Sequence, residues 1–245
     1  MSNANVIEIF SSVQGEGKYL GCRQIFVRLA GCNLNCNFCD TNFRRADFCR
    51  VETSAGSMTF RDEKNPLAAE KVADVIENFC AQVPTQAVSF TGGEPLLHGE
   101  FIRDVAALMK NFGTKIFLET NGTLVNELEK ILPVVDIVSM DIKLPSVVGK
   151  NLFAVHEKFL RVAVGKNLCV KIVVTGETST EEFLSAIELV AHVDEKIFVV
   201  LQPVTPVNGV SAVSAEKILS LQAAALRRLK NVRVIPQTHK LIAVP

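Results

Sequence analysis

Three of the seven cysteines lie close together, at Cys32, Cys36 and Cys39. A structural zinc site is closed by four ligands, whereas a 4Fe-4S cubane held by three thiolates keeps one iron open to a further ligand. The apolar run 25–29 predicts a strand directly before them, so the three thiols should converge in the loop at its C-terminal end. These residues alone leave three interpretations open: an iron–sulfur cluster, a zinc site completed by histidine, or buried cysteines without a ligand.

The other cysteines, Cys22, Cys49, Cys80 and Cys169, lie outside this triplet. Cys80 ends an apolar helical pattern and Cys169 stands in a predicted strand, so both are expected to be small core residues. Cys49 is the one further candidate ligand, and a bystander is the preferred interpretation. The odd number of cysteines and an N-terminus unlike a signal peptide favour metal or redox chemistry in the cytoplasm over a disulfide framework.

A glycine-rich motif, Thr91-Gly92-Gly93-Glu94-Pro95, follows the predicted strand 87–90. Its glycines permit close approach of another backbone segment at the strand end. Together with the Cys-x3-Cys-x2-Cys spacing and the aromatic Phe38 before the last cysteine, the motif resembles the radical S-adenosylmethionine superfamily. The resemblance implies that the open iron binds the amino and carboxylate groups of S-adenosylmethionine, and that an electron from the cluster cleaves this cofactor to a 5'-deoxyadenosyl radical.

Polar residues also follow the later predicted strands. Taken singly, each is as readily an ordinary polar strand end, but they are expected to share one face. The resemblance implies that they contact S-adenosylmethionine together with the first motif. The implied cofactor-binding residues are Phe38, Gly92, Gly93, Glu94, Glu119, Asn121, Ser139, Asp141, Lys143, Gln202, Pro203, Val204 and Thr205.

Alternating strands and helices are needed to bring these residues together. Short β-branched runs predict strands at 25–29, 87–90, 116–118, 134–140, 168–174, 197–201 and 232–235. Helical patterns lie between most of them: 68–79 with Asn65 as N-cap and Pro66 as first residue, 101–112, one that begins at Ser179 with Glu182 in a capping box, and 214–229. The alternation predicts an α/β fold, an open, partial (β/α)6 barrel of the radical S-adenosylmethionine type. We expect one domain over 1–245, with an irregular insertion at about 42–65 and the active site at the C-terminal strand ends.

Composition narrows the class of partner. Hydrophobic residues make up 48% of the chain, enough for a sizeable core, and 26 Lys+Arg balance 26 Asp+Glu. A chain without basic excess is not expected to bind nucleic acid, and no run of about eighteen apolar residues predicts a membrane span. A small molecule is therefore the expected partner.

Four further features span the chain: Val13-Gln14-Gly15-Glu16-Gly17 with Arg28 on the next strand, Cys39-Asp40-Thr41, Thr91, and Gln237-Thr238-His239-Lys240 near Pro245. Together they resemble the 7-carboxy-7-deazaguanine synthase family. Backbone amides with a glutamine suit a pterin edge, and an arginine suits a carboxylate. The resemblance implies substrate contacts from Val13, Gln14, Gly15, Glu16, Arg28, Thr91, His239 and Pro245, and Mg2+ bound by Thr41, substrate oxygens and water.

That family converts 6-carboxy-5,6,7,8-tetrahydropterin into 7-carboxy-7-deazaguanine with release of ammonia, a carbon–nitrogen lyase reaction in queuosine biosynthesis. The resemblance implies that a hydrogen is taken from C6, that the substrate radical rearranges, and that S-adenosylmethionine is regenerated. It also implies an electron donor such as flavodoxin or ferredoxin, a homodimer, and a terminal carboxylate at Pro245 that contacts the substrate.

One departure keeps an alternative open. Many members of that family carry Ser-Pro-Lys where this chain has Asp141-Ile142-Lys143. The sequence Asp-x-Lys also resembles the glycyl-radical-enzyme activases, which share the cysteine spacing and the Gly-Gly-Glu motif. A third interpretation, a non-catalytic iron–sulfur or zinc protein, leaves the glycine-rich motif and the polar strand ends unexplained.

Overall fold

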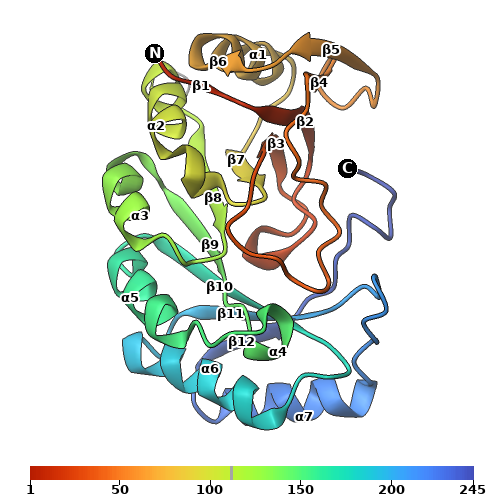
Figure 1. Ribbon diagram of the computed structural model, residues 1–245, viewed down its shortest axis with the longest axis vertical. Helices are drawn as coiled ribbons and strands as arrows, with labels where there is room; N and C mark the ends of the chain where they lie inside the picture. The colour runs from red at the N-terminus through yellow and green to blue at the C-terminus, as the bar shows by residue number, and fades with distance from the viewer. Residues whose placement is uncertain (111–112) are drawn as a thin grey trace.

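A ten-stranded sheet forms the centre of the molecule, which the computed structural model describes over residues 1–110 and 113–245. Its strand order is β12-β11-β10-β9-β8-β7-β3-β2-β4-β5, and over the described residues β12 and β5 do not pair, so the barrel stays open (Figure 1). The strands are β2 (Val6–Val13), β3 (Arg23–Leu29), β4 (Phe48–Glu52), β5 (Phe60–Lys64), β7 (Ala87–Gly92), β8 (Lys115–Thr120), β9 (Ile137–Asp141), β10 (Asn167–Val174), β11 (Phe198–Pro203) and β12 (Asn231–Val234). A short antiparallel pair joins β1 (Asn3–Ala4) to β6 (Leu67–Ala68).

In the order of the sheet, β3, β7, β8, β9, β10, β11 and β12 each run parallel to the next. Strand β2 pairs with the other edge of β3 and is antiparallel to it. Parallel strands require crossover connections, and helices supply them along the outside of the curved sheet (Figure 1). The helices are α1 (Ala69–Gln82), α2 (Gly99–Leu108), α3 (Val125–Ile131), α4 (Pro145–Val148), α5 (Phe153–Ala163), α6 (Thr180–Val193) and α7 (Ala215–Leu226), with 3-10 turns η1 (Gly17–Tyr19), η2 (Pro95–His98) and η3 (Leu132–Val134). The predicted α/β class and open, partial (β/α)6 barrel are confirmed.

The core lies between the sheet and these helices. In α1, Val72, Ile76 and Phe79 recur at helical spacing and are buried. Strand β10 is buried along most of its length, as expected of a parallel strand covered on both faces. Each large apolar side chain in such a core stabilises the fold by about 1.5–3 kcal/mol. A charged residue in the middle of β10, Lys171, is therefore unusual.

Two of the predicted helix starts are confirmed and one is wrong. Ser179 and Glu182 form the capping box of α6, and Ser214 caps α7. The start at Asn65 and Pro66 is wrong, because α1 begins at Ala69 after β6. The Asn65 side chain bonds the backbone of Val6 and Ala46 instead, so it holds two distant segments together. Of the pattern predicted at 101–112, α2 covers the part up to Leu108, and Phe112 lies outside the described residues.

The segment 42–65 is not wholly irregular, contrary to expectation. It contains β4 and β5, an antiparallel hairpin that extends the sheet beyond β2. The carboxylate of Glu52 is fully buried and accepts hydrogen bonds from the backbone N–H groups of Ser11, Gly56 and Met58, which organises the hairpin turn. Polar composition concealed these strands, because β4 buries mainly one face and β5, at the edge of the sheet, has no fully buried residue.

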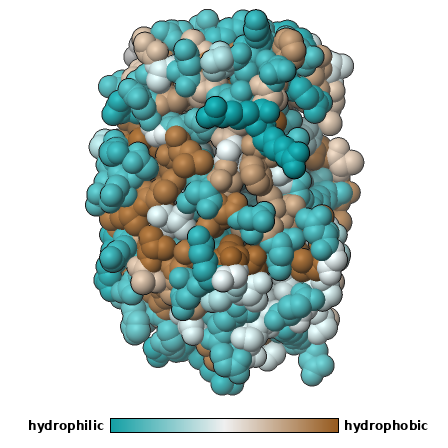
Figure 2. All heavy atoms as spheres, in the orientation of Figure 1, coloured by the Kyte–Doolittle hydropathy of each residue, from teal (hydrophilic) through white to brown (hydrophobic). Residues whose placement is uncertain are grey.

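The surface carries both polar and apolar regions. On the face shown in Figure 2, apolar side chains gather across the middle of the view, where Figure 1 places the strands, with polar side chains above and below. Within the described ranges, none of the helices has the length and apolar character needed to cross a bilayer.

Candidate functional site

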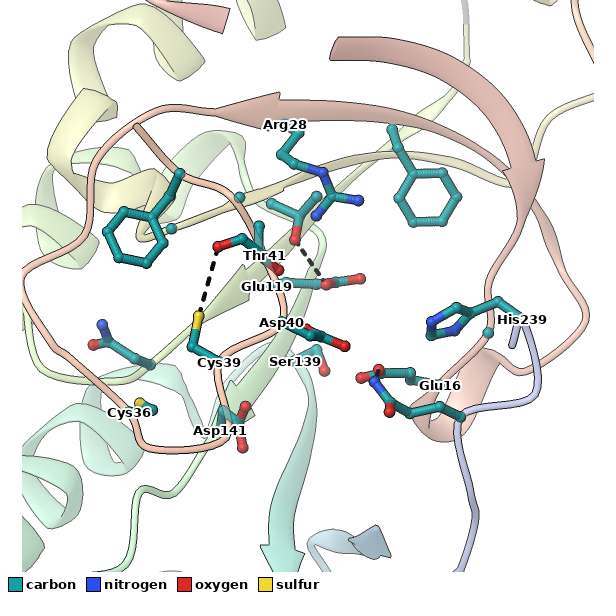
Figure 3. Close-up of a pocket in the computed structure, with 18 of the residues that line it drawn as sticks. Glu16, Arg28, Cys36, Cys39, Asp40, Thr41, Glu119, Ser139, Asp141 and His239 are labelled. Carbon is teal, nitrogen blue, oxygen red and sulfur yellow. Dashed lines mark hydrogen bonds between the residues drawn. The ribbon is translucent and has the colours of Figure 1, made fainter. Parts of the chain in front are cut away.

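A cavity of about 570 Å3 lies at the C-terminal ends of the parallel strands, a volume typical of small-molecule sites. Cysteine side chains occupy one side of it, and Glu16 and His239 lie on the other (Figure 3). Nearly all of the residues predicted from the sequence line this cavity. They are Val13, Gln14, Gly15, Glu16, Arg28, Cys32, Cys36, Phe38, Cys39, Thr41, Thr91, Gly92, Gly93, Glu119, Asn121, Ser139, Asp141, Lys143, Gln202, Val204, Thr205, His239 and Pro245. Two predicted residues, Glu94 and Pro203, are not part of the lining.

The thiols of Cys32, Cys36 and Cys39 face the cavity from the loop that follows β3. Among the described residues, no three His, Cys, Asp or Glu side chains gather around a single point as a mononuclear metal site requires. A cubane distributes its ligands over different iron atoms, so the three thiols that line one cavity suit such a cluster. The backbone N–H of Leu34 and the side-chain amide of Asn121 both point to Cys32 Sγ, at 3.5 and 4.0 Å, and are donors of the kind that tune cluster sulfurs.

Gly92 and Gly93 bring the end of β7 against the cysteine loop. A Cβ atom on Gly93 would lie 1.9 Å from the carbonyl oxygen of Gly31, so only glycine allows this approach. Glu94, which follows, is fully buried and accepts hydrogen bonds from Thr120 Oγ1 and Asn121 N, both at 2.8 Å. Burial raises the pKa of Glu94 to about 7 despite these hydrogen bonds. Glu94 thus ties the glycine-rich motif to the end of β8 rather than facing the cavity.

Two buried oxygen atoms on the cavity wall accept no hydrogen bond from the described protein groups: Asp141 Oδ1 and Gln202 Oε1. Unpartnered buried acceptors are costly, so they fit a ligand that brings N–H or O–H donors, as S-adenosylmethionine does. Lys143 Nζ donates to the other oxygen of Asp141 at 2.6 Å and lies 5.2 Å from the centre of the Phe38 ring. Burial alone would lower the pKa of Lys143, but Asp141 and Cys36 together outweigh burial and raise it.

Glu119 joins the cofactor side of the cavity to the side predicted for substrate. Its carboxylate accepts hydrogen bonds from Gln14 Nε2 at 2.8 Å, Thr91 Oγ1 at 2.9 Å and Ser89 Oγ at 3.2 Å. Strand β7, through Ser89 and Thr91, and the loop that follows β2, through Gln14, therefore hold this carboxylate of β8 in a fixed orientation. Ser139, on β9, and Asn121, just after β8, line the same cavity.

Arg28, on β3, lines the cavity across from Ser139 and Asp141 (Figure 3). Its Nε donates to Glu8 Oε1 at 2.7 Å, and its guanidinium carbon lies 5.9 Å from the centre of the Phe10 ring. Because Glu8 engages Nε, the terminal nitrogens of the fork can address a carboxylate in the cavity.

The C-terminal segment lies directly against the Gln-Gly-Glu-Gly loop. A Cβ atom on Gly15 would lie 2.2 Å from Nδ1 of His239, so a glycine is needed for the ring to pack there. Thr238 N donates to Gly15 O at 3.0 Å, and Gln237 Nε2 donates to Glu16 Oε1 at 2.7 Å. Motifs more than two hundred residues apart in the sequence thus form one wall of the cavity.

Sequence reasoning missed several lining residues, among them Glu8, Phe10, Arg50 and Lys171. Lys171 had a detectable signal, since a lysine inside a predicted apolar strand is rarely tolerated without a partner. Glu8 had no such signal, because its strand β2 was not predicted.

Comparison with known proteins gives the family. The model of the Radical SAM superfamily matches residues 27–204. The 7-carboxy-7-deazaguanine synthase of Geobacter sulfurreducens is 39% identical over 243 residues, which cover 98% of this chain and 97% of that protein. The chain belongs to the 7-carboxy-7-deazaguanine synthase family. The protein of the same name from Archaeoglobus fulgidus is also 39% identical, over 98% of this chain and 99% of its own.

This chain shares its fold with a solved structure to which its sequence identity is low. The crystal structure of QueE from Escherichia coli superimposes with a TM-score of 0.63 at 22% identity, and covers 97% of this chain and 95% of that one. Membership confirms the predicted superfamily, and a 4Fe-4S cluster, S-adenosylmethionine and Mg2+ are the cofactors of such enzymes. The alternative of a glycyl-radical-enzyme activase is not favoured.

Proposed function

We propose that the chain is a Mg2+-dependent radical S-adenosylmethionine lyase that converts 6-carboxy-5,6,7,8-tetrahydropterin into 7-carboxy-7-deazaguanine and releases ammonia, in the biosynthesis of queuosine or a related 7-deazapurine. The observation that carries the proposal is the contact of His239 with Gly15. Through it, the two motifs that distinguish this family meet on the cavity that the three cysteines also line.

The cluster and S-adenosylmethionine, when bound, supply the radical that takes a hydrogen from the substrate. We assign the cluster to Cys32, Cys36 and Cys39. The cofactor would be bound by Phe38, Gly92, Gly93, Glu119, Asn121, Ser139, Asp141, Lys143, Gln202, Val204 and Thr205, which all line the cavity. Glu94 would act as a positioning residue, through Thr120 and Asn121.

The substrate would lie between the Gln-Gly-Glu-Gly loop and the cluster. Arg28 binds its carboxylate, and Glu16 and His239 bind the aminopyrimidine edge through hydrogen bonds. Val13, Gln14, Gly15, Thr91 and Pro245 complete this part of the lining. Thr41 would hold Mg2+, whose remaining ligands come from substrate oxygens and water, in keeping with the preference of this ion for oxygen and for partial protein cages.

Four further properties are part of the proposal. The enzyme needs a reductant, for which flavodoxin or ferredoxin is suitable, and it works as a homodimer in the cytoplasm. Residues 1–245 act as one domain, a view supported by a hydrophobic core that includes residues from Ala4 to Val232.

The decisive experiment is anaerobic turnover. Reconstituted protein is incubated with 6-carboxytetrahydropterin, S-adenosylmethionine, Mg2+ and dithionite, and 7-carboxy-7-deazaguanine is sought by mass spectrometry. The control is the Cys36→Ala variant under the same conditions. Absence of product from protein with an intact cluster would refute the proposed reaction.

A further inference from the structure

Lys171 is the only charged residue in β10, and its ammonium group reaches the cavity. Its side chain is 16% exposed and forms an ion pair with Glu16 Oε2. Asp141 Oδ2 lies 3.6 Å from the same nitrogen. The second oxygen of Glu16 accepts the hydrogen bond from Gln237. Two segments that are distant in the sequence, the Gln-Gly-Glu-Gly loop and the end of β9, therefore contact this cation in the middle of β10, and the C-terminal segment joins them through Glu16.

We propose that Lys171 is a positioning residue for substrate binding, which fixes the Glu16 carboxylate and, through Gln237, the C-terminal segment against the cavity. The inference rests on the proposed function, in which Glu16 and His239 bind the pterin. The inference adds Lys171, which acts on the substrate through Glu16 and His239.

The geometry shows why Glu16 depends on this lysine. Glu16 and Asp141 are both largely shielded from water, with side chains 19% and 14% exposed, and a shielded carboxylate requires a partner. Asp141 has its own partner, since Lys143 donates to it at 2.6 Å. Lys171 is the ion-pair partner of Glu16 within the described residues. Its removal would leave Glu16 with only the neutral amide of Gln237.

The charge state of Glu16 follows from the same pair. Burial alone would raise the pKa of Glu16, but Lys171 and the hydrogen bonds from Lys171 and Gln237 outweigh burial and lower it to about 2. The carboxylate is therefore ionised, and able to accept N–H groups from an aminopyrimidine, at any pH near neutral.

Removal of Lys171 should raise the pKa of Glu16. The other charged groups that face this pair are Asp141 on β9, Glu119 on β8 and His239 on the C-terminal segment, with Lys143 beyond Asp141. Without Lys171, burial and the negative charges of Asp141 and Glu119 raise the pKa of Glu16, and the hydrogen bond from Gln237, the charge of His239 and the more distant Lys143 oppose the rise. As the pH falls through the raised pKa, Glu16 becomes protonated and loses its function as an acceptor. Substrate affinity should then fall with falling pH more steeply than in the parent enzyme.

The test measures pterin binding to the cluster-loaded protein with S-adenosylmethionine but without reductant, and KM and kcat with reductant, from roughly pH 5 to 9. Lys171→Met should raise the dissociation constant and KM about tenfold to a hundredfold, as expected for loss of a charge-assisted contact, with a smaller change in kcat. The increase should be larger at low pH. Lys171→Arg retains the cation and should keep the pH dependence of the parent.

Two further variants make the result decisive even if Lys171→Met folds poorly. Glu16→Gln should weaken pterin binding, and the double variant Lys171→Met/Glu16→Gln, which removes both charges, should bind no more weakly than Glu16→Gln alone. Lys230→Met, which removes an exposed lysine from its pair with Glu195, is the matched control and should behave as the parent. Iron content and S-adenosylmethionine binding should be retained throughout.

Additive losses in the double variant, or a pH dependence of pterin affinity in Lys171→Met equal to that of the parent, would overturn the assignment. Failure of the proposed function would look different, because the parent itself would then bind pterin without forming product or would not bind it at all.

Discussion

Burial controls the state of the cysteine thiols. It raises the pKa of Cys32 and of Cys36, so neither is a thiolate at neutral pH without a partner. Iron binds the deprotonated form and displaces the proton, so binding of the cluster compensates for burial. Cys49 differs, because it is fully buried in β4 with a pKa raised to about 12, and it does not line the cavity.

Single replacements of Cys32, Cys36 or Cys39 by Ala should abolish the cluster, whereas Cys49→Ala should retain it. The parent, after anaerobic reconstitution, should show the EPR signal of one reduced cubane, and S-adenosylmethionine should change that signal because one iron has no protein ligand. Iron analysis and EPR of the four variants provide the measurement. Loss of the cluster in Cys49→Ala, with retention in one of the other three, would show that the ligand assignment is wrong.

Thr41→Ala should weaken the stimulation of turnover by Mg2+ while the cluster and S-adenosylmethionine cleavage persist. Thr41 lines the cavity two residues after Cys39, and Mg2+ binds oxygen ligands. The Thr41 hydroxyl is a neutral ligand and should contribute about 1 kcal/mol to Mg2+ binding. Its loss should therefore raise the half-maximal Mg2+ concentration about fivefold. Thr41→Ser, which keeps the hydroxyl, is the control. An unchanged Mg2+ titration in Thr41→Ala would make this threonine an ordinary loop residue.

At the scale of elements, the hairpin of β4 and β5 depends on one carboxylate. Glu52 has no exposed surface and accepts three backbone N–H groups, from β2 and from its own turn. A glutamine in place of Glu52 would offer one acceptor oxygen instead of two. Its side-chain NH2 group would then face a backbone N–H group, which is also a donor. The hairpin also carries Arg50, which lines the cavity, so its stability bears on the site.

Glu52→Gln should lower the free energy of unfolding by about 2–3 kcal/mol, the range for loss of hydrogen bonds to a buried charged group. Urea denaturation of the protein, followed by circular dichroism, measures the change. Glu70→Gln, an exposed position in the first turn of α1, serves as the control and should change it by less than about 0.5 kcal/mol. Equal stability of the two variants would show that Glu52 is not required by the hairpin.

The parallel strands could be predicted because burial on both faces leaves them as continuous β-branched runs, as in β10 and β11. Strands β2, β4 and β5 escaped prediction, since each carries polar residues on one face or forms the edge of the sheet. Most of the site was predictable for a related reason: parallel strands end on the same side, so polar residues after them meet. Ion pairs such as Lys171 with Glu16 were not, because they join residues whose proximity only the folded chain creates.

At the scale of the whole molecule, the C-terminal segment connects one edge of the sheet to the loops that line the cavity. The segment leaves β12, at one edge of the sheet, and reaches the loop that follows β2 (Figure 1). Lys240 extends this path, because it forms an ion pair with Asp40 in the cysteine loop. The segment thus contacts both the predicted substrate side and the predicted cluster side of the cavity.

Lys240→Met should loosen the segment and raise KM for the pterin by roughly twofold to fivefold, while cluster content and S-adenosylmethionine cleavage stay as in the parent. The modest size follows from exposure: both side chains of the Lys240–Asp40 pair are about one-third accessible, and such pairs contribute about 0.2–1 kcal/mol. His239→Ala should have the larger effect, since its ring packs directly on Gly15 and faces the cavity. Lys240→Arg keeps the charge and is the control. Hydrogen exchange gives a second measurement, in which the amides of 237–244 should exchange faster in Lys240→Met than in Lys240→Arg because the ion pair no longer restrains them. If exchange and KM are the same in both variants, the pair does not hold the segment in place, and the contacts of Gln237 and Thr238 with the Gln-Gly-Glu-Gly loop are sufficient by themselves.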